Sequence, residues 1–338
     1  MSTKKVVTMK DIALRTGFSI NTVARALKNR DDVAPKSKAL IQKTAKEMNY
    51  INNGAASYLR TGHSKSLAVI LADITNPTFS AGVREIEQNA VNNGYSIMIF
   101  NTNENEEAEC TAIQTAISKN ADGILICPCS HSKDNLSFLA DTNIPFVLVG
   151  RKGDPSYPWV IRDDKKCGRL VARHLIHEAG CRNILVLGGD AGISSASERI
   201  EGFLEELRSA GLEQSPELFV QVDVKPGAAR KSMRQILDSG HVFDGIFCFS
   251  DIMAMEAIHE LRQAGLRIPE DVSVASIDNL SGIYPYLTSV DSVSEVGESL
   301  YNTAFQKLIG LITGNDPYPL HTTLDVRLYR YGSVRYCR

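Results

Sequence analysis

The chain has 338 residues, 43% of them apolar, and a formal charge of −2. This length allows a small domain plus one large or two medium domains with true hydrophobic cores. No apolar run approaches the roughly eighteen residues of a membrane span, and no apolar segment follows the Lys-rich start, so the sequence predicts a cytoplasmic protein without signal peptide or membrane contact.

The charge is divided unequally along the chain. Residues 1–66 carry 13 Lys or Arg against 4 Asp or Glu, a net charge of +9, so the remaining residues sum to −11. A concentrated positive charge is typical of a surface that binds nucleic acid. We therefore expect a basic N-terminal part that binds DNA and an acidic remainder that acts as a sensor.

The run from Met9 to Leu27 predicts two short helices joined by Gly17, which is placed for the left-handed residue of the turn. Ser19 is positioned to cap the second helix. A third helix is expected at about 36–49, with Leu40 on its inner face. Together they form the layout of a helix-turn-helix head.

The outer face of the second helix is expected to carry Ile20, Asn21 and Arg25. Asn pairs with adenine edges and Arg with guanine edges, so these residues are candidates for reading base sequence. Candidates for phosphate contact are Thr8, Ser19, Thr22, Lys28 and Lys36. The alternative is a charged three-helix unit that is merely solvated. The concentrated charge and the glycine turn both favour DNA binding.

From Leu67 onward, short apolar runs alternate with helical periods, as in parallel sheets flanked by helices. Expected strands lie at 67–73, 95–101, 123–127, 146–150, 183–187, 218–222, 245–250 and 272–278. Expected helices lie at 79–93, 104–119, 165–179, 195–210, 227–239 and 252–264. A further helix near 296–312 and a last strand near 324–331 follow. This count predicts two doubly wound subdomains.

Ligands of doubly wound sheets bind beyond the carboxyl ends of the strands. Polar residues at the expected ends are Asp73, Asn101, Arg151, Ser250, Asp251, Asp278 and Asn279. Carboxylate, amide and guanidinium groups pair well with neighbouring hydroxyls, so a sugar-like or nucleoside-like effector is indicated.

Three stretches of the head resemble the lactose/galactose-repressor (LacI/GalR) family: Val7-Thr-Met-Lys-Asp-Ile-Ala13, Gly17-Phe-Ser-Ile-Asn-Thr-Val-Ala-Arg25, and Met48-Asn-Tyr-Ile-Asn-Asn53 with the residues after it. The resemblance implies a hinge helix at 53–60 that folds on operator DNA. It also implies that Ala56 and Leu59 contact DNA, with Leu59 wedged into the minor groove. The chain departs from the family pattern at Asn52 and Ala24.

The body resembles the same family in its periplasmic-binding-protein-like core. The matching elements are Asp73-Ile-Thr-Asn-Pro-Thr-Phe79, Ser195-Ala-Ser-Glu-Arg199, Ser250-Asp-Ile-Met-Ala254 and Ile268-Pro-Glu-Asp-Val-Ser-Val-Ala-Ser-Ile-Asp278. The resemblance implies effector contacts from Asp73, Phe79, Arg199 and Asp278 first, and from Arg151, Asp163, Ser250 and Asp251 second. Departures occur at Gly150, Asp164, Ser250 and Ser276, so the pocket chemistry is altered.

Two of these side chains have local alternatives. Asp251 stands where it can cap the following helix instead of contacting an effector. Arg199 has Glu198 and Glu201 as possible ion-pair partners on its own helix, although exposed helix pairs of this kind contribute little.

Seven cysteines are scattered along the chain, and Cys127 and Cys129 have the wrong spacing for a redox or zinc CxxC motif. The glycines at 188–192 lack the spacing of a phosphate-binding loop, and no catalytic motif is present. We therefore expect free thiols, no metal, no cofactor and no enzyme activity.

The predicted organisation is a helix-turn-helix domain at 1–52, a hinge and linker at 53–66, and an effector-binding and dimerisation core at 67–338. The core divides into an N-subdomain (about 67–162 and 293–321) and a C-subdomain (about 163–292 and 322–338). The predicted function is a homodimeric, operator-binding transcriptional repressor controlled by a small effector, with a sugar-like one favoured. Alternatives are a nucleoside- or nucleobase-responsive regulator and a sugar receptor without regulatory role.

Overall fold

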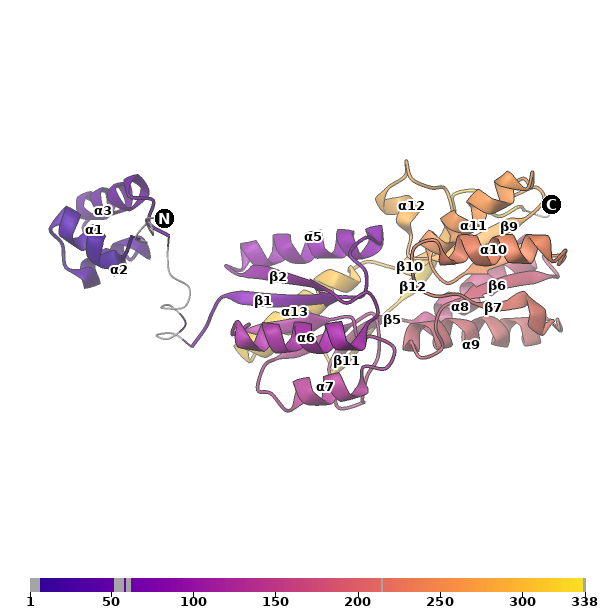
Figure 1. Ribbon diagram of the computed structural model, residues 1–338, viewed down its shortest axis with the longest axis horizontal. Coiled ribbons are helices and arrows are strands. Elements are labelled where there is room, and N and C mark those ends of the chain that lie inside the picture. The colour runs from indigo at the N-terminus through magenta and orange to yellow at the C-terminus, as the bar shows by residue number, and fades with distance from the viewer. Residues whose placement is uncertain (1–6, 52–57, 59–61, 214, 337–338) are drawn as a thin grey trace. The chain divides into compact units, whose positions relative to one another are not determined.

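A computed structural model describes residues 7–51, 58, 62–213 and 215–336 (Figure 1). The chain forms two compact units, 1–64 and 65–338, which are called here the head and the core. No helix in the described ranges is long and apolar enough to cross a membrane.

The head contains three helices: α1 (Met9–Thr16), α2 (Ile20–Leu27) and α3 (Pro35–Glu47). Gly17 ends α1 with φ +76°, which confirms its role as the left-handed residue of the turn. Ile12, Val23, Ala26 and Ile41 are fully buried between the helices. Leu40 is 49% exposed, so its predicted inward position is wrong. Successive residues of a helix are about 100° apart around its axis, and the buried side of α3 is formed by Ile41, Thr44 and Ala45.

The first sheet of the core has the order β11-β5-β4-β3-β1-β2, and all its described pairs are parallel. Its strands are β1 (Ser66–Leu71), β2 (Ser96–Asn101), β3 (Gly123–Ile126), β4 (Phe146–Val149), β5 (Trp159–Arg162) and β11 (His321–Leu324). Its helices are α5 (Pro77–Asn92), α6 (Glu106–Ser118), α7 (Lys133–Ala140) and α13 (Leu300–Thr313). This sheet and its helices form the first half of the core.

Alternation along β1 explains how both faces of this sheet are covered. Leu67, Val69 and Leu71 pack with apolar residues of α5 and α13, while Ala68 and Ile70 pack with residues of α6 and α7. Because successive strand residues point to opposite faces, a continuous apolar run is needed where helices cover both sides.

The second sheet has the order β12-β10-β9-β8-β6-β7, parallel except for the antiparallel pair of β10 and β12. Its strands are β6 (Ile184–Gly188), β7 (Phe219–Gln221), β8 (Gly245–Cys248), β9 (Ser273–Ile277), β10 (Asp291–Glu295) and β12 (Val326–Tyr329). The helical segments of this second half are α8 (Asp164–Arg173), η1 (His174–Glu178), α9 (Ser194–Ser209), η2 (Pro216–Leu218), α10 (Ala228–Asp238), α11 (Asp251–Gln263) and α12 (Leu280–Ile283).

The chain passes between the two sheets three times. It leaves the first sheet after Arg162, returns after Glu295, and leaves again after Leu324 (Figure 1). The predicted last strand at 324–331 is wrong as a single element, because the chain divides at Asp325 into β11 of one sheet and β12 of the other.

The predicted alternation of strands and helices is confirmed, and the two-subdomain parallel architecture with it. The elements outside the expected ranges include β5, β10, α7 and the short segments η2 and α12. β10 has the sequence Asp-Ser-Val-Ser-Glu, which lacks the apolar run by which the other strands were predicted. It nevertheless lies between β9 and β12 and is largely buried. The helix predicted from 296 begins at Leu300, since Ser299 caps it.

Candidate functional site

The outer face of α2 presents the predicted base-reading side chains. Ile20 is 49% exposed, and Asn21 and Arg25 are exposed as well. The Arg25 guanidinium pairs with Asp32, with 3.2 Å between Nε and Oδ1. This partner was not expected from the sequence. Asp32 follows α2 in the chain and occupies the guanidinium that is expected to read guanine.

Two of the predicted phosphate-contacting residues also cap helices. Thr8 caps α1 in a reciprocal pair with Asp11, and Ser19 caps α2 by accepting from the backbone N–H of Thr22 at 3.1 Å. An N-cap lies beside the free N–H groups of the first helical turn, where phosphate also binds, so capping and phosphate contact are compatible. Lys28 and Lys36 are exposed. The predicted contacts Ala56 and Leu59 lie outside the described residues.

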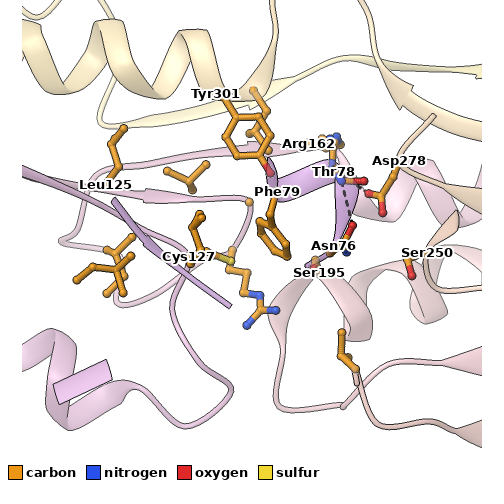
Figure 2. Close-up of a pocket in the computed structure, with 18 of the residues that line it drawn as sticks. Asn76, Thr78, Phe79, Leu125, Cys127, Arg162, Ser195, Ser250, Asp278 and Tyr301 are labelled. Atoms are coloured by element: carbon orange, nitrogen blue, oxygen red, sulfur yellow. Dashed lines mark hydrogen bonds and ion pairs between the residues drawn. The ribbon is translucent and has the colours of Figure 1, made fainter. Parts of the chain in front are cut away.

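A cavity of about 70 Å³ lies between the halves of the core, at the carboxyl ends of strands from both sheets. Of the residues expected to contact effector, Phe79, Arg151, Arg199, Ser250 and Asp278 line it. Figure 2 shows Phe79 and Tyr301 near its centre, and Asp278 with Ser250 on one side. The remaining wall is largely apolar and comes mainly from β1, β3 and β4.

Two other predicted contacts, Asp73 and Asp163, have partners elsewhere in the structure. Asp73 accepts from the backbone N–H and the hydroxyl of Thr75, at 2.8 and 2.7 Å, and lines a neighbouring surface pocket. Asp163 caps α8 by accepting from the N–H of Lys166 at 2.9 Å. Both carboxylates have local partners, and neither is among the residues that line the cavity.

Asp251 is fully buried and is not among the residues that line the cavity. It accepts hydrogen bonds from the hydroxyls of Ser276 and Ser292, the latter at 2.7 Å, and from the N–H of Leu280. Burial and the nearby charge of Asp278 raise the pKa of Asp251 to about 7. The cap of α11 is Ser250 and not Asp251, so Asp251 joins α11 to β9, β10 and α12.

Two of the arginines that line the cavity are held by carboxylates of their own half. Arg151 forms a bidentate pair with Glu104, with N–O distances of 2.9 and 2.5 Å, and also donates to the carbonyl of Pro128. Arg199 donates to Asp164 and to the carbonyl of Phe249, both at 2.8 Å, and its guanidinium lies 4.5 Å from the centre of the Phe249 ring. Such pairing fixes both guanidinium planes before any ligand binds.

Arg162, at the end of β5, is the third arginine of the cavity wall. Its Nε lies 2.5 Å from Glu295 Oε2, and its Nη1 lies 3.3 Å from Asp278 Oδ1. Burial opposes ionisation of Glu295, but the charge and hydrogen bond of Arg162 outweigh it and hold the Glu295 pKa at about 2. Burial raises the pKa of Asp278 in spite of Arg162 and Arg199.

Two of the four carboxylates that pair with the cavity arginines have an unusual backbone conformation. Asp278 has φ +122° and Glu104 has φ +57°, both in the region that side chains other than glycine rarely adopt. Strain of this kind costs on the order of 1–3 kcal/mol and is concentrated at binding sites. Gly150, where the family pattern usually has aspartate, has φ +73° and lines the same cavity.

Six polar or aromatic residues of the wall were missed by sequence reasoning: Asn76, Thr78, Arg162, Ser195, Phe249 and Tyr301. The Thr78 hydroxyl is buried and has no hydrogen-bond partner among the described residues. Thr78 lies next to the predicted contact Phe79, inside the stretch from Asp73 to Phe79 that resembles the family, so the sequence did point to this segment. Arg162 was marked by a charge at the end of an apolar strand.

The described residues contain no group of three His, Cys, Asp or Glu side chains arranged to hold a metal ion. The six described cysteines are free thiols, and five of them are buried. Burial raises the pKa of Cys127, which lines the cavity, to about 11. A thiol of this kind is a poor nucleophile at neutral pH.

Two family models match the chain. One, described as periplasmic binding proteins and sugar binding domain of LacI family, matches residues 64–319. The other, described as bacterial regulatory proteins, lacI family, matches residues 8–53.

Three individual proteins illustrate the similarity. The HTH-type transcriptional repressor PurR of Yersinia enterocolitica is 29% identical over 333 residues, 97% of each chain. A crystal structure of the Lac repressor dimer bound to operator and the anti-inducer ONPF matches with a TM-score of 0.82 and 22% identity, over 98% of this chain and 100% of that one. A periplasmic binding protein/LacI regulator from Alkaliphilus metalliredigens, complexed with D-xylulofuranose, is 26% identical over 80% of this chain and 99% of that one, with a TM-score of 0.69. The chain belongs to the LacI family of bacterial regulatory proteins, and it is a DNA-binding transcriptional regulator.

Proposed function

We propose that this protein is a repressor that binds a pseudo-palindromic operator as a homodimer in the cytoplasm, and that a small effector in the core cavity controls its affinity for DNA. A single head reads too few bases for specificity, while two heads on a two-fold axis match a palindromic site. The proposal includes no catalytic step.

The observation that carries the proposal is the outer face of α2. Ile20, Asn21 and Arg25 are exposed on a helix that follows a glycine turn, within a unit of strongly positive charge. These side chains have the chemistry to read base edges, while Thr8, Ser19, Thr22, Lys28 and Lys36 are suited to phosphate.

For the core we propose Phe79, Arg151, Arg199, Ser250 and Asp278 as effector contacts, with the additional wall residues Thr78, Arg162 and Ser195. Effector binding would change the angle between the halves and so the spacing of the two hinges at 53–60, with Ala56 and Leu59 acting on the DNA. The proposed division is a helix-turn-helix DNA-binding domain at 1–52, a hinge and linker at 53–66, and an effector-binding and dimerisation region at 67–338.

The first candidate for the effector is a sugar-like molecule, in line with the description of the matched core family and with the D-xylulofuranose complex of one relative. A nucleobase or nucleoside is the second candidate. It is favoured by the aromatic wall of Phe79, Phe249 and Tyr301 and by the pairing of all three cavity arginines with protein carboxylates. Such pairing leaves fewer free groups for the many hydroxyls of a sugar.

The test uses the full-length protein and DNA from upstream of its own gene. Fluorescence anisotropy is measured at several salt concentrations with this DNA and with a scrambled duplex. Arg25→Ala is expected to weaken specific binding by roughly ten-fold or more while leaving most non-specific binding. Equal loss of affinity for both duplexes would show that Arg25 does not read bases. Absence of salt-dependent DNA binding by the wild type would contradict the proposed function as a repressor.

A further inference from the structure

Arg162 differs from the other two arginines of the cavity in where its partners lie. Arg151 and Arg199 pair with Glu104 and Asp164 of their own halves. Arg162 ends β5 of the first sheet, but its carboxylate partners follow β9 and end β10 of the second sheet. Its ion pairs therefore join the two halves directly, at the wall of the cavity.

The position of Arg162 also coincides with the connections between the halves. It is the last strand residue before the first crossing, and Glu295 is the last strand residue before the second. Arg162 is also the register partner of Leu324, where β11 ends before the third crossing. One side chain thus stands where all three crossing strands end.

The pair of Arg162 and Asp278 belongs to the lining of two pockets. Arg162, Asp278, Thr78 and Tyr301 line both the cavity and a second pocket bounded by α5, α12 and residues 294–299. Figure 2 shows Arg162, Thr78 and Asp278 together at one side of the cavity. A change in this ion pair therefore alters the cavity wall itself.

The two bonds of Arg162 are unequal. Its contact with Glu295 is 2.5 Å, whereas its contact with Asp278 is 3.3 Å, longer than the 2.7–2.9 Å usual for charge-assisted hydrogen bonds. The contact with Asp278 is therefore the weaker one, and Arg162 remains anchored by Glu295 if it opens.

We propose that Arg162 is a latch residue that occupies the effector-binding carboxylate of Asp278 and holds the two halves together until effector displaces it. The inference rests on the proposed role of Asp278 as an effector contact. It also sets what the effector must offer, namely a hydrogen-bond donor for Asp278 and an acceptor for Arg162 on neighbouring atoms. A ligand without a donor leaves a buried carboxylate unpaired, which is costly.

The latch is tested through Cys127, which lines the cavity and is 4% exposed. Full-length protein is treated with N-ethylmaleimide without added effector, and the labelling rate of each cysteine is followed by peptide mass spectrometry. Arg162→Met is expected to raise the rate at Cys127 about ten-fold or more by increasing the open population. Cys167 and Cys248, fully buried in the second half, are expected to keep their wild-type rates.

Lys307→Met is the matched control, because Lys307 is fully buried and pairs with Asp316 at 2.9 Å within the first half. It removes a buried cation without touching a contact between the halves, so Cys127 is expected to keep its rate relative to Cys167 and Cys248. Arg162→Lys serves if Arg162→Met does not fold, because lysine keeps the charge but lacks the planar fork that serves both carboxylates. It is expected to raise the Cys127 rate by a smaller factor.

Unchanged labelling of Cys127 in the Arg162 variants would overturn the latch. An equal rise at all three thiols, matched by Lys307→Met, would assign Arg162 to general stability and overturn it as well. The experiment involves no DNA and no effector, so its failure is distinct from failure of the proposed regulator in the anisotropy assay.

Discussion

Gly168 on α8 lies directly against the backbone carbonyl of Arg199 on α9, so closely that a Cβ at Gly168 would come within 1.8 Å of the carbonyl oxygen. Gly202 on α9 makes the reciprocal approach, with 1.8 Å between an added Cβ and the carbonyl oxygen of Lys165. Two glycines thus allow the backbones of these helices to touch. The contact positions Arg199 and its partner Asp164, which comes from the start of α8.

The first prediction concerns these glycines. Gly168→Ala and Gly202→Ala are each expected to lower the free energy of unfolding by about 3 kcal/mol or more, because backbone atoms cannot move aside without separating the helices. The measurement is chemical denaturation. Gly188→Ala is the control, since the nearest atom to its Cβ would be the end of the Ile200 side chain, at an ordinary contact distance of 3.4 Å, and it should change stability by less than about 1 kcal/mol. Similar effects for all three would contradict the close-packing argument.

A second prediction follows from the pair of Arg25 and Asp32. Asp32→Asn frees the guanidinium for guanine, so operator affinity is expected to rise several-fold in an anisotropy titration. Asp31→Asn removes the same charge one residue earlier but leaves Arg25 paired, since Asp31 faces Lys38 at 3.8 Å. The ratio of specific to non-specific affinity should therefore rise only for Asp32→Asn. An equal gain in operator affinity in both variants would show that the effect comes from the loss of one negative charge and not from release of Arg25.

The third prediction concerns the pH dependence of stability. The Asp251 pKa of about 7 lies above its ordinary value of 3.8, so the folded protein retains a proton that the unfolded chain has lost. Its contribution to stability is complete below about pH 4 and is lost as pH rises through 7. Asp251→Asn lacks this dependence, so its stability relative to wild type is expected to improve from pH 4 to 8, by at most about 4 kcal/mol.

Chemical denaturation of the wild type and of Asp251→Asn across this pH range measures the difference between their free energies of unfolding. A constant difference would show that Asp251 is ionised throughout. The same variant also tests the sequence-based expectation that Asp251 contacts effector, because a buried positioning residue should leave effector specificity unchanged.

The fourth prediction concerns Asp278. A thermal-shift screen with sugars, nucleobases and nucleosides identifies a stabilising ligand. Asp278→Asn is nearly isosteric, and it is expected to abolish the response of operator binding to that ligand while retaining operator affinity in one state. Asp141→Asn, an exposed substitution at the end of α7, should respond as wild type does. A normal effector titration for Asp278→Asn would remove this residue from the site.

Much of the fold was predictable because its signals are local. Gly17, Ser19 and the apolar spacing predicted the helices of the head, and uninterrupted apolar runs predicted most strands of both sheets. The failures have local causes too. β10 is polar in sequence, because Asp291, Ser292 and Ser294 are buried as hydrogen-bonding groups, and composition alone does not distinguish such a strand from a loop.

The sequence by itself determined that a basic reading head precedes an acidic two-sheet core, because charge and periodicity are properties of neighbouring residues. Only the tertiary structure decided which polar groups face the cavity. Asp73 and Asp163 bond to residues two and three positions away, whereas Arg162 meets Asp278 and Glu295 across 116 and 133 residues of chain. The contacts of Arg162 depend on how the chain crosses between the two sheets, and this cannot be predicted from patterns among neighbouring residues.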